Sequence, residues 1–231
     1  MKKGKHVEVT EGVDVYIEGL LESGESAGVE RLRVETLTIP HSEMQTTLSQ
    51  MRFVGGLLRA IGARRVLEVG TLQGYGAAAM AAEIPDDGIV VTLEKDIRYI
   101  DNLHERWKKA GLDKKIELRT APAIDSLVLL QKETIDAQIS ADGENFLFDL
   151  IFIDADKGSY KTYVEEGMKL LRSRGIMLID NILWGGSVAT GPSDDNITRA
   201  LQDLNRWIFA TYGAHASIVP AWDGMIMIVK D

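Results

Sequence analysis

Residues 64–84, RRVLEVGTLQGYGAAAMAAEI, place a short apolar run, a glycine-rich turn and an alanine-rich segment in direct succession. The apolar run that ends in glycine predicts a strand, and the alanine-rich segment predicts a helix. Gly70, Gly74 and Gly76 would let the turn approach a ligand closely, and the helix N-terminus would favour a negative group. A tight turn needed only for packing has the same pattern.

The alternation of strand and helix continues to the C-terminus. The predicted strands are residues 89–96, 115–123, 148–156 and 175–181, followed by a hairpin at 215–230. The predicted helices are residues 97–110, a segment ending near 131, 160–171 and 196–210, with a loop at 132–146. This order predicts an α/β fold: a Rossmann-like, mostly parallel seven-stranded sheet with helices on both faces and an antiparallel C-terminal hairpin strand.

The N-terminal part has a purely helical pattern. Residues 10–23 and 42–61 carry apolar residues at three- and four-residue spacing, and Gly62 suits the end of the second helix. We therefore expect a helical cap over residues 1–62 on a core over residues 63–231. A length of 231 residues suits a single domain.

Composition narrows the class of protein. The sequence has no cysteine, which excludes disulfides and thiolate sites and fits a cytoplasmic location. No stretch of about 18 apolar residues predicts a membrane span. The net charge of −9 opposes nonspecific binding to nucleic acid, because phosphate binding depends on Lys and Arg.

Glu94 ends the second predicted strand, at the edge of the sheet where ligands bind in such folds. A carboxylate there can accept hydrogen bonds from both ribose hydroxyls of a nucleoside. Glutamates are also common on surfaces, so Glu94 alone is weak evidence. Together with the glycine-rich turn it indicates a nucleoside cofactor, and NAD, FAD and S-adenosylmethionine all fit.

Polar side chains also follow two later strands. Asp154 and Asp156 come after one apolar strand, and Asp180 and Asn181 come after the next. These side chains could be loop caps or salt-bridge partners. As a set, their oxygens suit Mg²⁺, whereas the lack of cysteine and the distance of every histidine from this cluster disfavour Zn²⁺.

Lys157 follows Asp154 by three residues. Next to a metal ion in a partly dry pocket, its charged form would be disfavoured and it could act as a base. An ordinary solvated lysine that balances the two aspartates explains its position equally well.

The segments VLEVGTLQGYG, FDLIFIDADKGSY and GIMLIDNILWGGSV, with Glu94 between them, resemble the cation-dependent O-methyltransferases typified by caffeoyl-CoA and catechol O-methyltransferases. The resemblance runs from about Ile39 to the C-terminus. It implies an enzyme that uses S-adenosylmethionine and Mg²⁺, or another divalent cation such as Ca²⁺ or Mn²⁺. The implied substrate is a small catechol-like molecule with two neighbouring hydroxyls, and the family habit implies a homodimer.

The resemblance also implies a role for individual residues. Those implied to contact the cofactor are Glu68, Gly70, Thr71, Tyr75, Gly76, Glu94 on the ribose, Ala123 near the adenine, Asp154, and Asp156 on the ammonium group. The implied metal ligands are Asp154, Asp180 and Asn181, with Lys157 as the base and Asp154 beside it in catalysis. Trp184 and Trp222 would line the substrate pocket. Gly76 stands where relatives usually have serine, and Trp222 where they commonly have glycine.

Three alternatives remain from the sequence. A tRNA wobble hydroxyuridine O-methyltransferase would need a basic face, for which Arg64, Arg65, Lys108, Lys109, Lys114 and Lys115 are the candidates. A nucleotide-linked oxidoreductase would explain the glycine-rich turn but not the aspartate pairs. A non-catalytic binding protein of the same fold would not need the metal ligands or Lys157.

Overall fold

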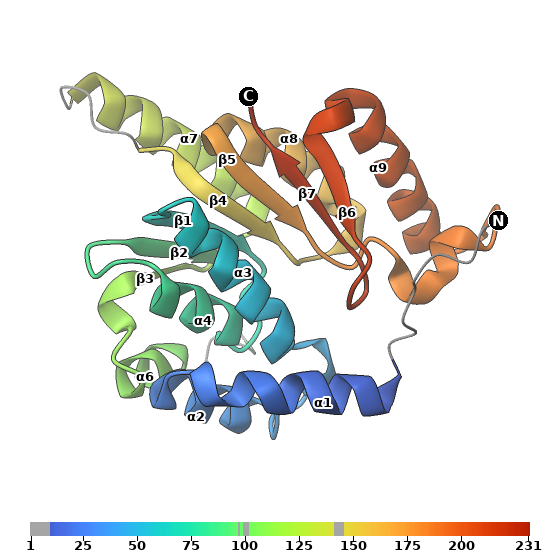
Figure 1. Cartoon of the computed structure of the whole chain (residues 1–231). Coiled ribbons are helices and arrows are strands. Elements are labelled where there is room, and N and C mark those ends of the chain that lie inside the picture. The colour runs from blue at the N-terminus through green and yellow to red at the C-terminus, as the bar shows by residue number, and fades with distance from the viewer. Residues whose placement is uncertain (1–9, 97, 99–101, 141–145) are drawn as a thin grey trace.

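The computed structural model describes residues 10–96, 98, 102–140 and 146–231. Within these residues, seven strands form one sheet in the order β3-β2-β1-β4-β5-β7-β6 (Figure 1). The strands are β1 (Arg65–Val69), β2 (Ile89–Leu93), β3 (Ile116–Arg119), β4 (Phe148–Ile153), β5 (Leu171–Ile179), β6 (Ala216–Val219) and β7 (Met225–Val229). Strands β1 to β5 pair in parallel, whereas β7 is antiparallel to β5 and β6. The predicted fold class is confirmed.

Helices cover both faces of the sheet (Figure 1). One face packs against α2 (Ala27–Thr36), α3 (Leu48–Ala60), α4 (Tyr75–Glu83) and α6 (Leu103–Lys109). The other packs against α7 (Ala123–Ser140), α8 (Tyr160–Leu170) and α9 (Asn196–Tyr212). Neighbouring strand residues such as Val66 and Leu67 therefore enter opposite cores, which explains the continuous apolar strands. No helix within the described ranges is both long and apolar enough to cross a bilayer.

The strand order changes direction between β1 and β4. From β1 the chain builds outward through β2 and β3, and then returns to add β4 and β5 on the other side. The amide of Asp154 donates to the carbonyl of Val69, and that of Asp180 donates to the carbonyl of Ile153. The carboxyl ends of β1, β4 and β5 therefore meet at one edge, where ligands bind in open α/β sheets. We call this the carboxyl edge.

The N-terminal helices differ from the predicted ones at two places. Helix α1 (Glu11–Leu21) lies within the predicted segment, but α3 begins at Leu48 instead of residue 42, because the Thr47 side chain caps it by accepting from the Gln50 amide. Residues Ser42–Met44 form a separate 3-10 turn. Helix α2 was not predicted, since only Val29 and Leu32 among its apolar residues are buried.

The predicted loop at 132–146 was wrong over residues 132–140, where α7 continues to Ser140; residues 141–145 lie outside the described part. Polar residues in α7 bind neighbouring elements, which apolar spacing does not reveal. Glu133 binds Arg119 at 2.8 and 3.0 Å, and Gln131 donates to Glu166 of α8 at 2.8 Å. Within the helix predicted over residues 97–110, Leu103–Lys109 form α6, and residues 97 and 99–101 lie outside the described part.

Candidate active site at the carboxyl edge

The glycine-rich turn after β1 lies directly against the end of β4. Gly70 has a φ of 99°, and a methyl group placed on it would overlap the carbonyl oxygen of Asp154. Only glycine meets both requirements, because it tolerates positive φ and has no side chain. The turn predicted to contact a cofactor and the aspartate predicted to bind metal are therefore packed together.

Glu94 lies beside this turn and holds it in shape. Its carboxylate accepts hydrogen bonds from the backbone amides of Thr71 at 3.3 Å and Leu72 at 2.9 Å. It also accepts from the amides of Lys95 and Asp96, each at 2.9 Å. Glu94 is thus at the predicted place, next to the glycine-rich turn. Its predicted contact with ribose stays a prediction.

Glu68 is almost completely buried behind the turn, with 2% of its surface exposed. The Thr92 hydroxyl donates to its carboxyl group, and the hydroxyls of Thr92 and Thr71 are 2.5 Å apart. Burial raises the pKa of Glu68 to about 8, with smaller contributions from the charges of Asp154 and Glu94, although the hydrogen bond from Thr92 acts in the opposite direction. Glu68 is therefore a buried acid that retains its proton near neutral pH.

Gly76 leaves the space that this acid occupies. A methyl group on Gly76 would overlap Oε1 of Glu68, and Thr46 Oγ1 would be its next neighbour at 3.9 Å. A serine at position 76, as in the family, would require the Glu68 carboxyl group to move. The departure at Gly76 is thus coupled to the position of Glu68.

The protonation of Glu68 predicts a pH dependence of stability. Because the pKa is raised on folding from 4.5 to about 8, its contribution to stability is fully present below pH 4.5 and is lost as the pH rises through 8. We expect the free energy of unfolding to fall over this range, by at most about 1.4 kcal/mol per unit of pKa difference. Glu68→Gln, which is neutral at every pH, should show a shallower fall in urea denaturation. The exposed Glu11→Gln is the control, and parallel pH curves for wild type and Glu68→Gln would refute this explanation.

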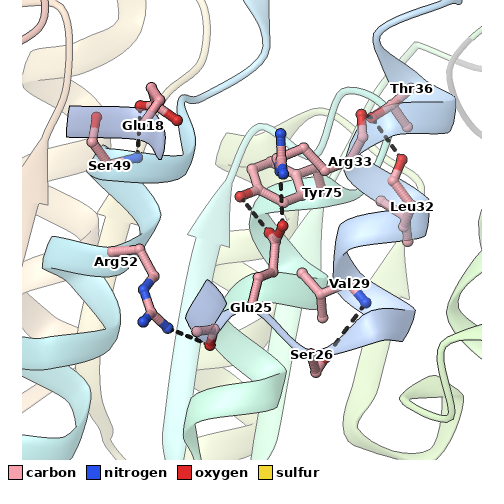
Figure 2. Close-up of polar contacts among 11 residues, drawn as sticks. Glu18, Glu25, Ser26, Val29, Leu32, Arg33, Thr36, Ser49, Arg52 and Tyr75 are labelled. Atoms are coloured by element: carbon pink, nitrogen blue, oxygen red, sulfur yellow. Dashed lines mark hydrogen bonds and ion pairs between the residues drawn. The ribbon is translucent and has the colours of Figure 1, made fainter. Parts of the chain in front are cut away.

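Tyr75 begins α4, but its hydroxyl points away from the carboxyl edge. It donates to Glu25 at 3.0 Å, and Glu25 also accepts from Arg33 at 2.8 Å (Figure 2). Burial and the neighbouring Glu25 raise the pKa of Tyr75, so it stays a neutral donor. Its side chain anchors the segment before α2, and only its backbone lies at the turn predicted to hold the cofactor.

Asp156 lies at the end of β4 and is held by three donors. Ser159 and Tyr163 donate to it at 2.6 and 2.7 Å, and Lys95 at 3.2 Å. Burial opposes its ionisation, but these hydrogen bonds outweigh burial and lower its pKa. Asp156 therefore presents a carboxylate next to Lys95, the residue that follows Glu94. Its predicted contact with a cofactor ammonium group stays a prediction. Ala123, predicted near the adenine, is the first residue of α7.

The residues predicted to bind metal converge on Lys157. Its ammonium group donates to Asp154 Oδ1 at 2.9 Å, to Asn181 Oδ1 at 2.5 Å and to the Tyr160 hydroxyl at 2.7 Å. Residues from the ends of β4 and β5 are thus brought to one point, and the positive ammonium group of Lys157 lies between their oxygens. Asn181 has a φ of 58°, a left-handed conformation that asparagine tolerates better than most residues.

Asp180 shows why these residues fit a divalent cation. Its side chain is buried, with 3% of the residue exposed, and Oδ1 has no hydrogen-bond partner within the described structure. Burial and the charge of Asp154 raise the pKa of Asp180 to about 7. A cation would remove both the repulsion and the unsatisfied oxygen.

The donor set also favours one type of metal. Over the described residues there is no group of three or more His, Cys, Asp or Glu that could hold a metal ion. The predicted set instead has two carboxylates, from Asp154 and Asp180, and the amide oxygen of Asn181. Hard oxygen donors in this small number suit Mg²⁺, which retains positions for water or substrate oxygens.

Gln50 faces the same site and was not predicted from the sequence. It lies in α3, is 3% exposed, and its amide lowers the pKa of Asp180. Yet Nε2 of Gln50 has no hydrogen-bond partner in the described structure. An unsatisfied donor and an unsatisfied acceptor, Asp180 Oδ1, thus face each other in the interior. In the sequence, Gln50 is only a polar residue in an amphipathic helix, so no local pattern identifies it.

The two tryptophans predicted in the substrate pocket are placed differently. Trp184 is half-buried in the 3-10 segment Trp184–Ala189 that follows Asn181. Trp222, in the β6–β7 turn, packs on α3: its indole nitrogen donates to Ser49 Oγ at 2.9 Å and its ring lies 5.7 Å from that of Phe53. Asp223 next to it accepts from the Gly185 amide at 2.7 Å. The β6–β7 turn therefore ties the loop after β5 to the N-terminal helices.

Comparisons with known proteins identify relatives of this chain. The model of the O-methyltransferase family matches residues 21–231. A mouse protein, catechol O-methyltransferase domain-containing protein 1, is 32% identical over 206 residues, which cover 89% of this chain and 75% of that protein. Caffeoyl-CoA O-methyltransferase 1 of Eucalyptus globulus is 29% identical, over 86% of this chain and 80% of its own length. The crystal structure of an O-methyltransferase from Bacillus cereus in complex with SAH has a TM-score of 0.80 at 28% identity, covering 95% of this chain and 97% of that one.

Proposed function

The chain belongs to the O-methyltransferase family as an S-adenosylmethionine-dependent enzyme of the caffeoyl-CoA and catechol type, and we propose which acceptor it methylates. The proposed acceptor is a small molecule carrying two neighbouring hydroxyls, one of which is methylated with the help of a divalent cation. One observation carries this proposal. Lys157, Asp154 and Asn181 meet at the carboxyl edge, next to a buried Asp180 that has an unsatisfied oxygen. Two acidic ligands, an amide oxygen and a candidate base are thereby collected at one point.

We assign the cofactor to the opposite side of Asp154, along the glycine-rich turn. The turn is closely packed on Asp154, so a methyl donor bound there would adjoin the acceptor site. The residues proposed to contact it are Glu68, Gly70, Thr71, the backbone of Tyr75 and Gly76, Glu94, Ala123, Asp154 and Asp156. Asp156 would exchange Lys95 for the cofactor's ammonium group, and Glu94 would accept from the ribose.

The proposed metal ligands are Asp154, Asp180 and Asn181. When bound, Mg²⁺ or another divalent cation such as Mn²⁺ or Ca²⁺ would supply Lewis-acid polarisation of the acceptor's two oxygens. Lys157 would lie beside that cation, since its ammonium group contacts Asp154 and Asn181. In its neutral form, Lys157 Nζ would be placed to accept the proton of the acceptor hydroxyl.

The surroundings of Lys157 suit methyl transfer from a sulfonium. The positive sulfonium and the negative acceptor oxygen neutralise each other as they react, so exclusion of water favours the reaction. Trp184 in the loop after Asn181, and Trp222 held on α3 by Ser49, are proposed to provide this cover. The turns at Asn181 and Gly70, where the backbone has positive φ, would supply orientation.

A small-molecule acceptor fits the surface better than tRNA. Of the residues that could form a basic face, Arg64 is paired with Asp87, and Lys115 donates to the carbonyl of Ile84 at 2.7 Å. Labelled S-adenosylmethionine with Mg²⁺ should therefore transfer methyl groups to catechols, flavonoids or acyl-CoA esters with vicinal hydroxyls. Weak catechol turnover together with strong tRNA methylation would overturn the choice of acceptor, and preference for NADH in calorimetry would overturn the choice of cofactor.

We further propose that the protein is a homodimer through α1. None of the residues of α1 is buried, and Val15, Tyr16 and Leu20 are 60–68% exposed. Light scattering should give twice the monomer mass, and Leu20→Glu should weaken dimerisation by at least about 10-fold, because it places a charge in the interface. Val34→Glu, an exposed apolar residue on α2, is the matched control. A monomeric wild type at high concentration would refute the dimer.

A further inference from the structure

The three proposed metal ligands are not held in the same way. Lys157 donates to Asp154 at 2.9 Å and also to Asn181, so it fixes both of these side chains. Its remaining hydrogen bond goes to the Tyr160 hydroxyl at 2.7 Å. An ammonium group has three N–H donors, so Lys157 has none left for Asp180. Because carboxylates that bind metal ions are themselves hydrogen-bonded, Asp180 requires a donor from another residue.

Gln50 is a buried donor that faces Asp180. Both residues are 3% exposed, and neither Gln50 Nε2 nor Asp180 Oδ1 has a hydrogen-bond partner in the described part of the chain. The amide of Gln50 is nevertheless near enough to lower the pKa of Asp180. The two groups are thus within electrostatic reach of each other but outside the geometry of a hydrogen bond. A small movement of either side chain would join donor and acceptor.

The backbone that carries Gln50 is fixed from several sides. Thr47 caps α3 and accepts from the Gln50 amide at 3.2 Å. The amide of the preceding residue, Ser49, donates to Glu18 of α1 at 3.1 Å (Figure 2). The Ser49 hydroxyl accepts from the indole nitrogen of Trp222 at 2.9 Å. The first turn of α3 is therefore anchored to α1 and to the β6–β7 turn, and it brings the side chain of Gln50 to a defined place.

The packing of α3 does not explain an amide at this position. The neighbouring buried residues Met51 and Val54 are apolar, and an apolar side chain would leave no polar atom unsatisfied. An amide is neutral at every pH, so Gln50 adds no positive charge that would repel a cation. It also adds no negative charge that would repel Asp180. The position of Asp180 therefore accounts for both the polarity and the neutrality of Gln50.

We propose that Gln50 is a positioning residue, whose amide donates to Asp180 and holds that carboxylate in the orientation in which it binds the divalent cation. The inference rests on the proposed function, since it concerns the cation assigned to Asp154, Asp180 and Asn181. Mg²⁺ demands near-ideal octahedral geometry, whereas Ca²⁺ accepts more varied arrangements of its ligands. A fixed Asp180 should therefore favour Mg²⁺ over Ca²⁺.

Calorimetry of Mg²⁺ and of Ca²⁺ binding, with S-adenosylmethionine present, tests this role without turnover. Gln50→Met keeps the length of the side chain and removes the donor. It should weaken Mg²⁺ binding by about 10- to 100-fold, the usual effect of losing the partner of a metal ligand, and Ca²⁺ binding by no more than about 3-fold. Gln131→Met is the matched control, because Gln131 also donates to a carboxylate, Glu166 at 2.8 Å, but lies in α7 on the other face of the sheet.

A second variant tests the same role if Gln50→Met does not fold. Gln50→Glu keeps the size of the side chain, but an ionised glutamate cannot donate to Asp180. Its added negative charge should strengthen the binding of both cations, so the ratio of the two affinities is the readout. The preference for Mg²⁺ over Ca²⁺ should fall by about 10-fold. The affinity of Gln50→Met for S-adenosylmethionine should equal that of the wild type, because the glycine-rich turn is unaltered.

The outcomes separate the role of Gln50 from the proposed function. Equal losses of Mg²⁺ and Ca²⁺ affinity in Gln50→Met would mean that Gln50 does not act by orienting Asp180. An unchanged Mg²⁺ affinity would also overturn the positioning role, while leaving the proposed metal site in place. A wild type that binds neither cation would overturn the metal dependence in the proposed function, and the role of Gln50 with it.

Discussion

Removing the Asn181 side chain is expected to lower metal-stimulated methyl transfer by at least about 100-fold, above the usual effect of changing a residue that only supports a metal ligand. Asn181 supplies one of three proposed ligands, and the remaining two carboxylates would hold the cation less firmly and in a different geometry. Asn181→Gly is the sharper variant, because glycine keeps the positive φ that alanine would strain. Asp154→Ala should have an equal or larger effect.

The measurement is initial rate against Mg²⁺ or Mn²⁺ concentration, with calorimetry of the metal alone as a readout that does not require turnover. Asn196→Ala is the control, since Asn196 lies on the surface at the start of α9 and pairs with Arg199. Full activity of EDTA-treated wild type on a catechol would show that the metal assignment is wrong. Retained metal affinity in Asn181→Gly would show that Asn181 is not a ligand.

Loss of the Lys157 ammonium group is expected to cut turnover by roughly 10²- to 10⁴-fold, the usual range for a general base. Lys157→Met is preferable to alanine because it keeps a long apolar stem in place of the lysine side chain. The substitution leaves Asp154 and Asn181 without the donor they share, so the metal-free protein should also lose stability. Saturating Mg²⁺ should restore stability but not turnover.

This pattern distinguishes a base from a structural lysine. Initial rates across pH, together with thermal unfolding with and without Mg²⁺, separate the two effects. Lys169→Met on α8 serves as the control for loss of a lysine. Turnover that hardly changes in Lys157→Met would mean that the cation alone activates the acceptor and that Lys157 only balances the aspartates.

Much of the site could be predicted from residue order. Each of the aspartates, Glu94 and the glycine-rich turn directly follows an apolar strand, and the carboxyl ends of parallel strands meet at one edge. The predictions that failed concern helices whose apolar residues show only a weak periodic pattern. Helix α2 and the second half of α7 are specified by contacts to other segments, such as Glu133 with Arg119, which no local window contains.

The sequence by itself determined which residues follow each strand along the chain: a glycine-rich turn, then Glu94, then Asp154 to Lys157, then Asp180 with Asn181. The local sequence pattern suffices to place these residues after strands, because hydrophobic periodicity and turn residues are properties of neighbouring positions. Only the tertiary structure decided which atoms meet. The Lys157 ammonium group between Asp154 and Asn181, Gln50 facing Asp180, and Glu68 in the space left by Gly76 join residues far apart in the chain. Such contacts depend on how helices pack on the sheet, and that packing arises from burial of whole faces instead of from any short segment.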